Sequence, residues 1–435
     1  MKIVIAGTGY VGLVTGTCLS EVGHNVLCVD IDEKKVELMK DGISPIYEPD
    51  LEELIKKNYK AGRLDFTTDY ANAFKDSDTI FIAVGTPERE DGSANLDYVY
   101  NVAKQIAENI EKDCLIVIKS TVPIGVNDQI EAFIKENLKN NVKIEVASNP
   151  EFLAQGTAVN DTLNASRIVI GVESKTAEEI LREVYNRFNQ PIVVTSRRSA
   201  EMIKYASNDF LALKISFINE VANLCELVGA NVEDVSLGMS YDPRIGNKFL
   251  NPGLGYGGSC FPKDTKALQW FAETNGYEIK TVKATIEVNQ FQKFRLLRKA
   301  KKRFKKLSGL KVAVLGLTFK PGTDDLRDAP SIPNVKMLLE EGAEVVVYDP
   351  VGMDNFKRLF TDQVKYAAEP GEALKDADAA FIFTEWQQIK ELSLKEYKQL
   401  MKNAVIFDGR NCYSLKDAEA ADVEYYSIGR PNVNC

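Results

Sequence analysis

One cysteine of the chain, Cys260, lies in a glycine-rich segment, NPGLGYGGSCFPKDT, that spans residues 251–265. Lys263 and Asp264 follow it and bring charges of both signs close to the thiol. A thiolate is a strong nucleophile, a nearby cation favours the thiolate, and glycines let a substrate approach the backbone without obstruction by Cβ atoms. The segment therefore predicts a reactive cysteine, with Asp264 available to order a water molecule or to position a lysine.

The alternative for Cys260 is a structural role, because a free cysteine is often simply buried. A reactive thiol is needed where an enzyme oxidises an aldehyde further. The thiolate adds to the aldehyde, the thiohemiacetal loses a hydride, and water hydrolyses the resulting thioester to a carboxylate. The other six cysteines, in an odd total without a CxxC pair, are typical of free thiols in a reducing cytoplasm rather than of disulfides or a zinc site.

A dinucleotide site is indicated at the start of the chain. KIVIAGTGYVGLVTGTCLSEVGHNVLCVD has the pattern of a buried strand, a glycine turn, a helix and a second strand, with Gly7, Gly9 and Gly12 as GxGxxG. The glycines let the backbone approach a pyrophosphate, and the helix N-terminus supplies N–H donors. Asp30 ends the second strand, where an acid that binds ribose is expected and would repel a 2′-phosphate. The pattern predicts NAD rather than NADP, against the alternative of a glycine turn needed only for packing.

Three further apolar runs, DTIFIAVGTP, CLIVIKSTVP and KIEVASNPEF, end in small or polar residues. In a parallel sheet, ligands bind at the carboxyl ends of the strands. Thr86, Thr121 and Glu151 are therefore expected near the cofactor crevice.

The second half of the chain repeats the pattern of the first. KVAVLG at 311 corresponds to KIVIAG at 2, and GAEVVVYD, ending at Asp349, corresponds to GHNVLCVD, ending at Asp30. The repeat predicts a second doubly wound α/β domain. Its first turn lacks GxGxxG and carries Lys320 and Arg327, so it either binds a second nucleotide-type ligand through cations or is a packing domain with surface cations.

A long helix is expected between the two halves, at 199–229, where no proline and no internal glycine interrupts the helix formers. It is apolar on more than one side, which suits a helix that links two domains and two subunits. Lys204 and Asn208 are four residues apart and share one face. The predicted fold class is therefore α/β, with two doubly wound Rossmann-like domains joined by a central long helix.

Composition narrows the classes of function. The 435 residues are 45% hydrophobic and 27% charged, as in a soluble globular protein, and the net charge of -9 argues against nucleic acid or an anionic membrane as partner. No apolar run is long enough for a membrane span. The chain has one histidine, His24, which is expected in a surface turn. A single histidine argues against Ser–His–Asp triads and histidine-ligated metals, so no metal is expected.

The motifs GTGYVG, VGTP, STVPIG, SNPEFL, FLNPGLGYGGSCFPKD and GLTFKPGTDDLRDAPS, with the Lys204/Asn208 pair, extend over essentially the whole chain. On these motifs the sequence resembles the UDP-glucose/GDP-mannose dehydrogenase family. The resemblance implies NAD-dependent four-electron oxidation of UDP-glucose at C6 to UDP-glucuronate, a cytoplasmic homodimer, and a place in polysaccharide biosynthesis. It also implies three domains: 1–196 for NAD, 197–307 for dimerisation and the cysteine loop, and 308–435 for the UDP-sugar.

Site residues follow from the same resemblance. Cys260 is expected to be the nucleophile, Lys204 and Asn208 to hold the sugar and the oxyanion, and Asp264, or Thr121 with Glu151, to order water. Lys204 is expected to act as a cation rather than a free base. The implied cofactor contacts are Gly7, Gly9, Tyr10, Val11, Gly12, Asp30, Lys35, Thr86, Thr121, Lys263 and Arg327. The implied substrate contacts are Glu151, Phe152, Leu153, Lys204, Asn208, Arg244 (from the partner subunit), Phe249, Leu250, Asn251, Pro252, Gly253, Gly257 and Lys320.

Two alternatives stay open. A sibling enzyme would oxidise GDP-mannose or a UDP-N-acetylhexosamine, and a sensor would bind a nucleotide sugar without catalysis. Retention of Cys260, Lys204 and Asp264 together argues against the sensor. NADH fluorescence with UDP-glucose, but not with GDP-mannose, would distinguish the first alternative.

Overall fold

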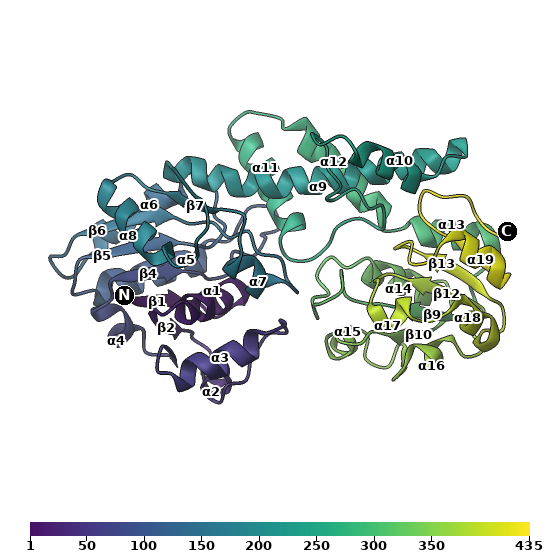
Figure 1. Cartoon of the computed structure of the whole chain (residues 1–435), viewed down its shortest axis with the longest axis horizontal. Helices are drawn as coiled ribbons and strands as arrows, with labels where there is room; N and C mark the ends of the chain where they lie inside the picture. The colour runs from purple at the N-terminus through teal and green to yellow at the C-terminus, as the bar shows by residue number, and fades with distance from the viewer. The chain divides into compact units, whose positions relative to one another are not determined.

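The computed structural model describes all 435 residues, and the chain divides into two compact units, Met1–Ser207 and Asn208–Cys435. The boundary between the units falls inside α9 (Arg197–Val228), a helix of 32 residues. Figure 1 shows this helix as the longest element of the chain. The predicted α/β fold with a long central helix is confirmed, whereas the three-domain division with boundaries after 196 and 307 stays a prediction.

The N-terminal unit contains an eight-stranded sheet in the order β3-β2-β1-β4-β5-β6-β7-β8. Neighbouring strands run parallel except β6 and β7, which meet antiparallel at Ser148 and Gly171. The strands are β1 (Lys2–Ala6), β2 (Asn25–Val29), β3 (Leu64–Thr67), β4 (Thr79–Ile82), β5 (Cys114–Ile118), β6 (Ile144–Ser148), β7 (Ile168–Gly171) and β8 (Ile192–Thr195). The central strands are apolar throughout because helices cover both faces of the sheet.

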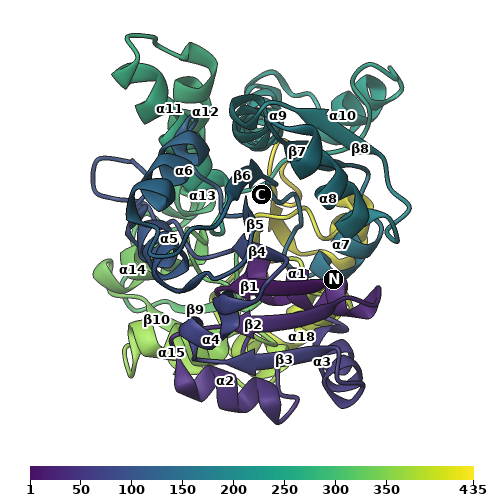
Figure 2. The same cartoon turned by 90° about the vertical axis from the view of Figure 1, so that its left-hand side faces the viewer.

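Two core clusters lie on the two faces of this sheet. One contains apolar side chains of α1, α3, α7 and α8, and the other contains those of α4, α5 and α6. Figure 2 shows α5 and α6 on one side of the strands and α1, α7 and α8 on the other. The helices are α1 (Tyr10–Glu21), α2 (Glu33–Lys40), α3 (Leu51–Lys60), α4 (Tyr70–Lys75), α5 (Asp97–Asn109), α6 (Val126–Asn137), α7 (Ala158–Leu163) and α8 (Lys175–Tyr185).

The C-terminal unit contains a six-stranded parallel sheet in the order β11-β10-β9-β12-β13-β14. This is the order of the first six strands of the other sheet, so the predicted repeat is present in the fold. Its strands are β9 (Lys311–Leu315), β10 (Glu344–Tyr348), β11 (Lys365–Tyr366), β12 (Ala379–Ile382), β13 (Val405–Asp408) and β14 (Glu424–Tyr426). Its helices are α10 (Val232–Ser240), α11 (Phe261–Thr274), α12 (Lys280–Gln292), α13 (Arg295–Phe304), α14 (Ser331–Glu340), α15 (Met353–Phe360), α16 (Pro370–Leu374), α17 (Gln387–Lys390), α18 (Leu394–Leu400) and α19 (Leu415–Ala421).

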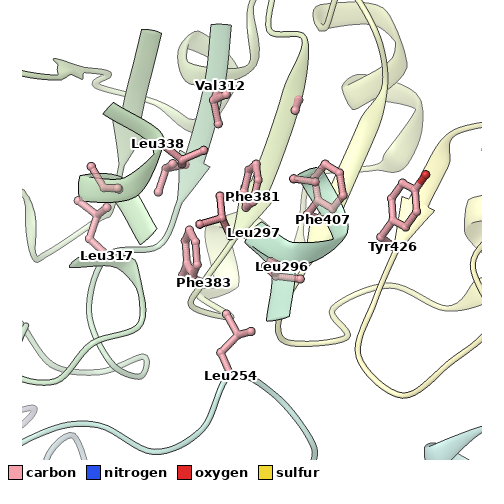
Figure 3. Packing of buried hydrophobic residues seen from close by; sticks show 14 of the residues in the cluster. Leu254, Leu296, Leu297, Val312, Leu317, Leu338, Phe381, Phe383, Phe407 and Tyr426 are labelled. Atoms are coloured by element: carbon pink, nitrogen blue, oxygen red, sulfur yellow. The ribbon is translucent and has the colours of Figure 1, made fainter. Parts of the chain in front are cut away.

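The glycine-rich loop before α11 is anchored in the core of the C-terminal unit. Leu254, from this loop, is fully buried and belongs to the same cluster as Leu296 and Phe383. Figure 3 shows its side chain pointing from the loop toward these two residues. Truncation of such a buried leucine costs about 2–5 kcal/mol, so the anchor holds the cysteine loop against the sheet of this unit.

The prediction for His24 is wrong. The residue does lie in the turn between α1 and β2, but its side chain is buried, and its Nε2 atom lies 2.9 Å from the carbonyl oxygen of Val184 in α8. Burial lowers the pKa of His24. The ring therefore links this turn to a helix that lies 160 residues further along the chain.

None of the helices combines the length with the apolar character that a membrane crossing requires.

Candidate active site

The glycine turn after β1 fits a pyrophosphate. Gly7 has a φ of +100°, and a Cβ atom on Gly12 would lie 1.9 Å from the carbonyl oxygen of Gly7, so packing alone requires both glycines. A Cβ atom on Gly9 would have no protein atom within 4 Å. Gly9 is also the N-cap of α1 and offers no side-chain cap to the first N–H groups. The open space at Gly9 therefore lies where an anion would be bound by the start of α1.

Asp30 lies at the end of β2 and is tied to this turn. Its Oδ2 atom accepts hydrogen bonds from the amide (2.8 Å) and the hydroxyl (2.5 Å) of Thr8, and its Oδ1 atom accepts one from the amide of Asp32 (3.1 Å). Burial opposes ionisation, but the bonds from Thr8 outweigh it and lower the pKa of Asp30, with a smaller contribution from the charge of Lys35. The carboxylate is therefore negative, as a partner of ribose hydroxyls would be.

Asp349, the counterpart of Asp30 in the repeat, accepts hydrogen bonds from a larger set of donors. Its Oδ2 atom accepts from the amide of Leu317 (2.7 Å) and the indole of Trp386 (3.0 Å), and its Oδ1 atom accepts from the amide of Gly352 (2.7 Å). The carboxylate is buried, and donors from the same unit satisfy its hydrogen-bonding capacity. The repeat is thus shared in fold, and both acids bind the turn after the first strand, but Asp349 accepts from more donors than Asp30.

A buried ion pair lies at the ends of β5 and β6. Lys119 Nζ is 2.9 Å from Glu151 Oε2 and donates a hydrogen bond to Asn149 Oδ1 (3.1 Å). Glu151 Oε1 accepts from the amides of Phe152 (2.6 Å) and Leu153 (2.9 Å). Burial opposes ionisation of Glu151, but the charge of Lys119 outweighs it and lowers the pKa. Glu151 therefore acts as a hydrogen-bond acceptor and not as a proton donor.

Lys119 was not among the predicted site residues. Its signal is a single charge inside the apolar run CLIVIKSTVP, at the point where the strand ends. A lysine there either points to solvent or is buried against an acid, and the sequence alone does not tell which.

The N-terminal unit also places Lys204 near Glu151. The charge of Lys204 contributes to the lowered pKa of Glu151, and its Nζ atom lies 5.4 Å from the centre of the Phe152 ring. One turn earlier on α9, Glu201 accepts hydrogen bonds from the amides of Gly125 (2.6 Å) and Asn127 (2.9 Å) at the start of α6. Glu201 thereby fixes the first turns of α9, and with them Lys204, to the segment that follows Thr121.

Other predicted residues of this unit lie on the loops and helix ends around the strands. Thr86 donates its hydroxyl hydrogen to the carbonyl oxygen of Thr121 (2.8 Å), which joins two predicted cofactor contacts. Tyr10 and Val11 begin α1, and the hydroxyl of Tyr10 accepts from the amide of Gly156 (3.2 Å).

Cys260 is the N-cap of α11 and its side chain is exposed. The positive end of the helix dipole is adjacent, which stabilises negative charge at this position. All seven cysteines are free, as predicted, but burial raises the pKa of others, to about 12 for Cys18 and Cys114. These thiols are inert, whereas Cys260 is presented to solvent at a helix N-terminus.

The glycines around Cys260 have a packing role. A Cβ atom on Gly257 would lie 2.7 Å from the carbonyl oxygen of Asp328, and one on Gly258, which has a φ of +80°, would lie 2.7 Å from the Phe319 ring. The amide of Gly258 also donates to the carbonyl oxygen of Arg327 (2.8 Å). The cysteine loop is pressed against the loop after β9, and only glycine allows this approach. Substrate contacts at Gly253 and Gly257 stay predictions.

Three amide side chains hold the same loop and were not predicted. Asn289 Oδ1 accepts from the amide of Tyr256 (2.7 Å), and Asn289 Nδ2 donates to the carbonyl oxygen of the same residue (3.0 Å). Gln292 donates to the carbonyl oxygen of Gly253 (2.7 Å), and Asn219 accepts from the Gly253 amide (2.8 Å). Polar residues at 289 and 292, one turn apart on α12, are the signal that sequence reasoning had available.

Asp264 lies one turn after Cys260 on α11 and is almost fully buried, with 1% of its surface exposed. Its Oδ2 atom accepts from Asn208 Nδ2 (2.6 Å), and its Oδ1 atom accepts from Lys263 Nζ (2.5 Å). Three predicted residues, Asn208, Lys263 and Asp264, are therefore brought together within hydrogen-bond distance.

Arg327 supplies a cation close to the thiol. Its pKa is raised mainly by a bidentate pair with Asp325, at 2.9 and 2.7 Å, and the charge of Cys260 adds to this. Lys320 lies in the same loop, with Nζ 5.7 Å from the centre of the Phe319 ring.

The remaining substrate-loop residues precede Cys260. Phe249 has a φ of +62°, and its ring centre lies 6.2 Å from that of Phe261. Leu250 is buried, and Asn251 and Pro252 lie in the loop between α10 and α11. Arg244 has 87% of its side chain exposed and pairs with Asp242 at 2.6 Å.

Comparisons with known proteins agree with this arrangement. Three domains of the UDP-glucose/GDP-mannose dehydrogenase family match the chain: the NAD-binding domain at 1–189, the central domain at 198–291 and the UDP-binding domain at 313–415. The chain is 51% identical to a UDP-glucose 6-dehydrogenase of Bacillus subtilis (strain 168), over 100% of this chain and 98% of the relative. It is 47% identical to a UDP-glucose 6-dehydrogenase of Rhizobium meliloti (strain 1021), over 99% and 100%.

Solved structures give the same result. A UDP-glucose dehydrogenase of the hyperthermophilic archaeon Pyrobaculum islandicum superposes with a TM-score of 0.90 at 39% identity, over 94% of each chain. A UDP-D-ManNAc dehydrogenase of Pyrococcus horikoshii superposes with a TM-score of 0.87 at 27% identity, over 99% of each chain. The predicted family, enzyme class and NAD cofactor are confirmed. The chain belongs to the UDP-glucose/GDP-mannose dehydrogenase family, as an NAD-dependent oxidoreductase that carries all three domains of that family.

Proposed function

We propose that this protein oxidises C6 of UDP-glucose to the carboxylate of UDP-glucuronate. The observation that carries the proposal is the exposed thiol of Cys260 at the N-cap of α11, one turn from the Asn208–Asp264 hydrogen bond. Relatives named UDP-glucose 6-dehydrogenase at 51% and 47% identity support UDP-glucose over an N-acetylhexosamine, since the UDP-D-ManNAc dehydrogenase shares only 27%. GDP-mannose is the remaining alternative within the family.

The chain's own residues account for the second oxidation. NAD, when bound at the glycine turn, accepts the hydride in each of the two oxidations. The Cys260 thiolate adds to the C6 aldehyde and forms a carbon–sulfur bond, and the resulting thiohemiacetal gives up a hydride to become a thioester. Water then displaces the thiolate and leaves the carboxylate. Lys204 and Asn208 are suited to stabilise the oxyanion by positive charge and by an amide N–H.

Water must be ordered for the hydrolytic step, and two carboxylates are available. Asp264 is held by Asn208 and Lys263, and Glu151 is held by Lys119 and two backbone amides. Both are fixed acceptors that orient a water molecule by hydrogen bonding. We assign the water to Asp264, because it lies on the same helix as Cys260.

The three-domain division is part of the proposal: 1–196 binds NAD, 197–307 dimerises and presents the cysteine, and 308–435 binds the UDP-sugar. The family domains at 1–189, 198–291 and 313–415 support these ranges. The free thiols support a reducing cytoplasm, and the net charge of -9 supports a partner set without nucleic acid.

We further propose a homodimer that is formed through α9 and α10. Phe210, Phe217 and Leu224 are exposed at intervals of seven residues on α9, which places them on one face of the helix. Leu237 of α10 and Tyr241, the residue after its C-terminus, are exposed as well. Apolar surface on neighbouring elements of one unit is typical of a protein–protein contact.

Arg244 is proposed to reach the substrate of the partner subunit. If it does, mixing Arg244→Ala chains with Cys260→Ser chains produces some dimers with one intact site, and activity partly returns. Subunit exchange without any return of activity would exclude this role.

The reaction is tested by counting products. Complete conversion of limiting UDP-glucose is expected to yield two NADH per sugar, no free aldehyde, and UDP-glucuronate by mass spectrometry. GDP-mannose and UDP-N-acetylhexosamines are expected to give much lower kcat/KM. A ratio near one, or a preference for GDP-mannose, would contradict the proposal.

A further inference from the structure

A second carboxyl group, that of Asp209, is buried beside the Asn208–Asp264 contact. Asp209 follows Asn208 on α9, and only 5% of its surface is exposed. Neither Oδ1 nor Oδ2 has a hydrogen-bond partner. A buried polar atom without a partner is rare in a folded protein and calls for an explanation.

The two neighbouring acids are compensated very differently. Asp264 accepts a charge-assisted hydrogen bond from Lys263 (2.5 Å) and a second bond from Asn208 (2.6 Å). Asp209 has neither a cation nor a hydrogen bond from another residue. An ionised carboxylate without compensation is very costly inside a protein, and a second negative charge close by increases that cost. Of the two acids, Asp264 is therefore the charged one.

We propose that Asp209 is a positioning residue that keeps its proton at neutral pH, so that Asp264 carries the only negative charge of this pair of acids. The inference rests on the proposed function, because it assigns Asp264 to the water that hydrolyses the thioester. Paired acids whose environments separate their protonation states are a recurring device for dividing roles in an active site.

The electrostatic surroundings within the C-terminal unit support this division. Burial, and then the charge of Asp264 on α11, raise the pKa of Asp209 to about 8. Tyr256, in the loop before α11, is the other titratable group that interacts with Asp209, and burial raises its own pKa further. No cation of this unit lowers the pKa of Asp209. Asp209 thus loses its proton in mildly alkaline solution, while Tyr256 stays neutral.

Ionisation of Asp209 affects catalysis through Asp264. A second negative charge repels the carboxylate of Asp264 and weakens its hold on a water molecule at the thioester. For a group that titrates near 8, the protonated fraction falls from about nine tenths at pH 7 to about one tenth at pH 9. The rate of thioester hydrolysis is therefore expected to fall by up to about ninefold over this range through Asp209 alone.

The test compares kcat against pH, from 6 to 10, for the full-length protein and two variants. Asp209→Asn keeps the shape of the side chain and is neutral at every pH, and Asp209→Ala removes the carboxyl group without adding an amide. Both are expected to retain activity at pH 7 and to lose the alkaline decrease, so that kcat at pH 9 exceeds that of the unaltered protein several-fold. Asp234→Asn, an exposed acid on α10, is the matched control and is expected to keep the original profile.

A second measurement does not depend on activity. A carboxyl group that is protonated in the folded chain and ionised in the unfolded chain lowers stability as pH rises from about 4 to about 8. The folding equilibrium constant of the unaltered protein is therefore expected to fall relative to that of Asp209→Asn by up to about tenfold per pH unit in this window. Urea unfolding at pH 5, 6, 7 and 8 measures this ratio.

The outcomes separate the two proposals. If UDP-glucose is not oxidised by the unaltered protein, the proposed function is wrong, and the unfolding series still tests whether Asp209 holds a proton. If UDP-glucose is oxidised but both Asp209 variants retain the alkaline decrease, Asp209 does not act through Asp264. A constant stability ratio between pH 5 and 8 would show that Asp209 is ionised in the folded protein and would overturn the inference.

Discussion

Lys119 Nζ and Glu151 Oε2 lie 2.9 Å apart in a buried ion pair at the carboxyl ends of two parallel strands. Lys119 is held in place by its hydrogen bond to Asn149, and its charge keeps Glu151 ionised. This pair sets the local charge next to Phe152 and Lys204 in the N-terminal unit.

Replacement of Lys119 by Met is expected to destabilise the protein by about 3–5 kcal/mol, because it leaves Glu151 buried without its cation. The pKa of Glu151 determines how this loss of stability depends on pH. In the unaltered protein the lowered pKa of Glu151 contributes stability above the unfolded value of about 4, and this is lost as pH falls. Without Lys119 the pKa of Glu151 rises. The variant is therefore expected to gain stability relative to the unaltered protein as pH falls from 7 to 5. Urea unfolding at both pH values measures the difference.

Lys112→Met is the control for that experiment. Lys112 pairs with Asp78 at 2.6 Å, and the two side chains are 47% and 34% exposed, against 6% and 13% for Lys119 and Glu151. A surface pair of this kind contributes about 0–1 kcal/mol. If the two variants lost equal stability, the buried pair would have no special role.

Asn289 is expected to matter for catalysis although it is distant from Cys260 in sequence. Asn289→Ala leaves the amide and the carbonyl of Tyr256 without their partner, at a cost of about 1–3 kcal/mol for each buried group. The cysteine loop should then lose its fixed geometry, and kcat should fall by tenfold or more, on the order of the effect of a misplaced catalytic group. Isothermal titration should show NAD binding unchanged.

Asn275→Ala, at the exposed C-terminus of α11, is the matched control and should leave kcat within about twofold, as surface substitutions usually do. A normal kcat for Asn289→Ala would mean that Leu254 and the glycines hold the loop without this residue.

Asp30→Ser is expected to narrow the preference for NAD over NADP. The carboxylate is ionised and tied to the glycine turn by Thr8, so it repels a 2′-phosphate. Serine removes the charge and retains a hydroxyl for the ribose. The ratio of kcat/KM for the two cofactors measures the effect, and an unchanged ratio would place discrimination elsewhere.

Sequence reasoning predicted the local features of the fold and missed the long-range ones. The glycine turn, the acid that ends β2 and the repeat at 311 are short patterns with a direct physical meaning, and they predicted both sheets. An uninterrupted run of helix formers predicted α9. The burial of His24 depends on Val184, and the cysteine loop depends on Asn289 and Gln292, which lie more than 30 residues away. Contacts of this kind leave no periodic pattern in the sequence.

The partners of charged side chains are equally hard to predict from the sequence. Lys119 follows an apolar run and Asp209 precedes one, and only the fold shows that Lys119 has a partner and that Asp209 has none. Asp349 matched Asp30 in the repeat, but the indole of Trp386 and four backbone amides donate hydrogen bonds to its carboxylate.

The central claim is that Cys260 is the nucleophile of the second oxidation, and the rate of UDP-glucuronate formation by Cys260→Ser tests it most directly. Serine keeps the size of the side chain but ionises far less readily, and the only histidine is buried near Val184 and gives it no base. The rate is expected to fall by about a thousandfold or more, with NAD binding unchanged and with Cys435→Ser, the other exposed thiol, fully active. Near-normal formation of UDP-glucuronate by Cys260→Ser would contradict the account.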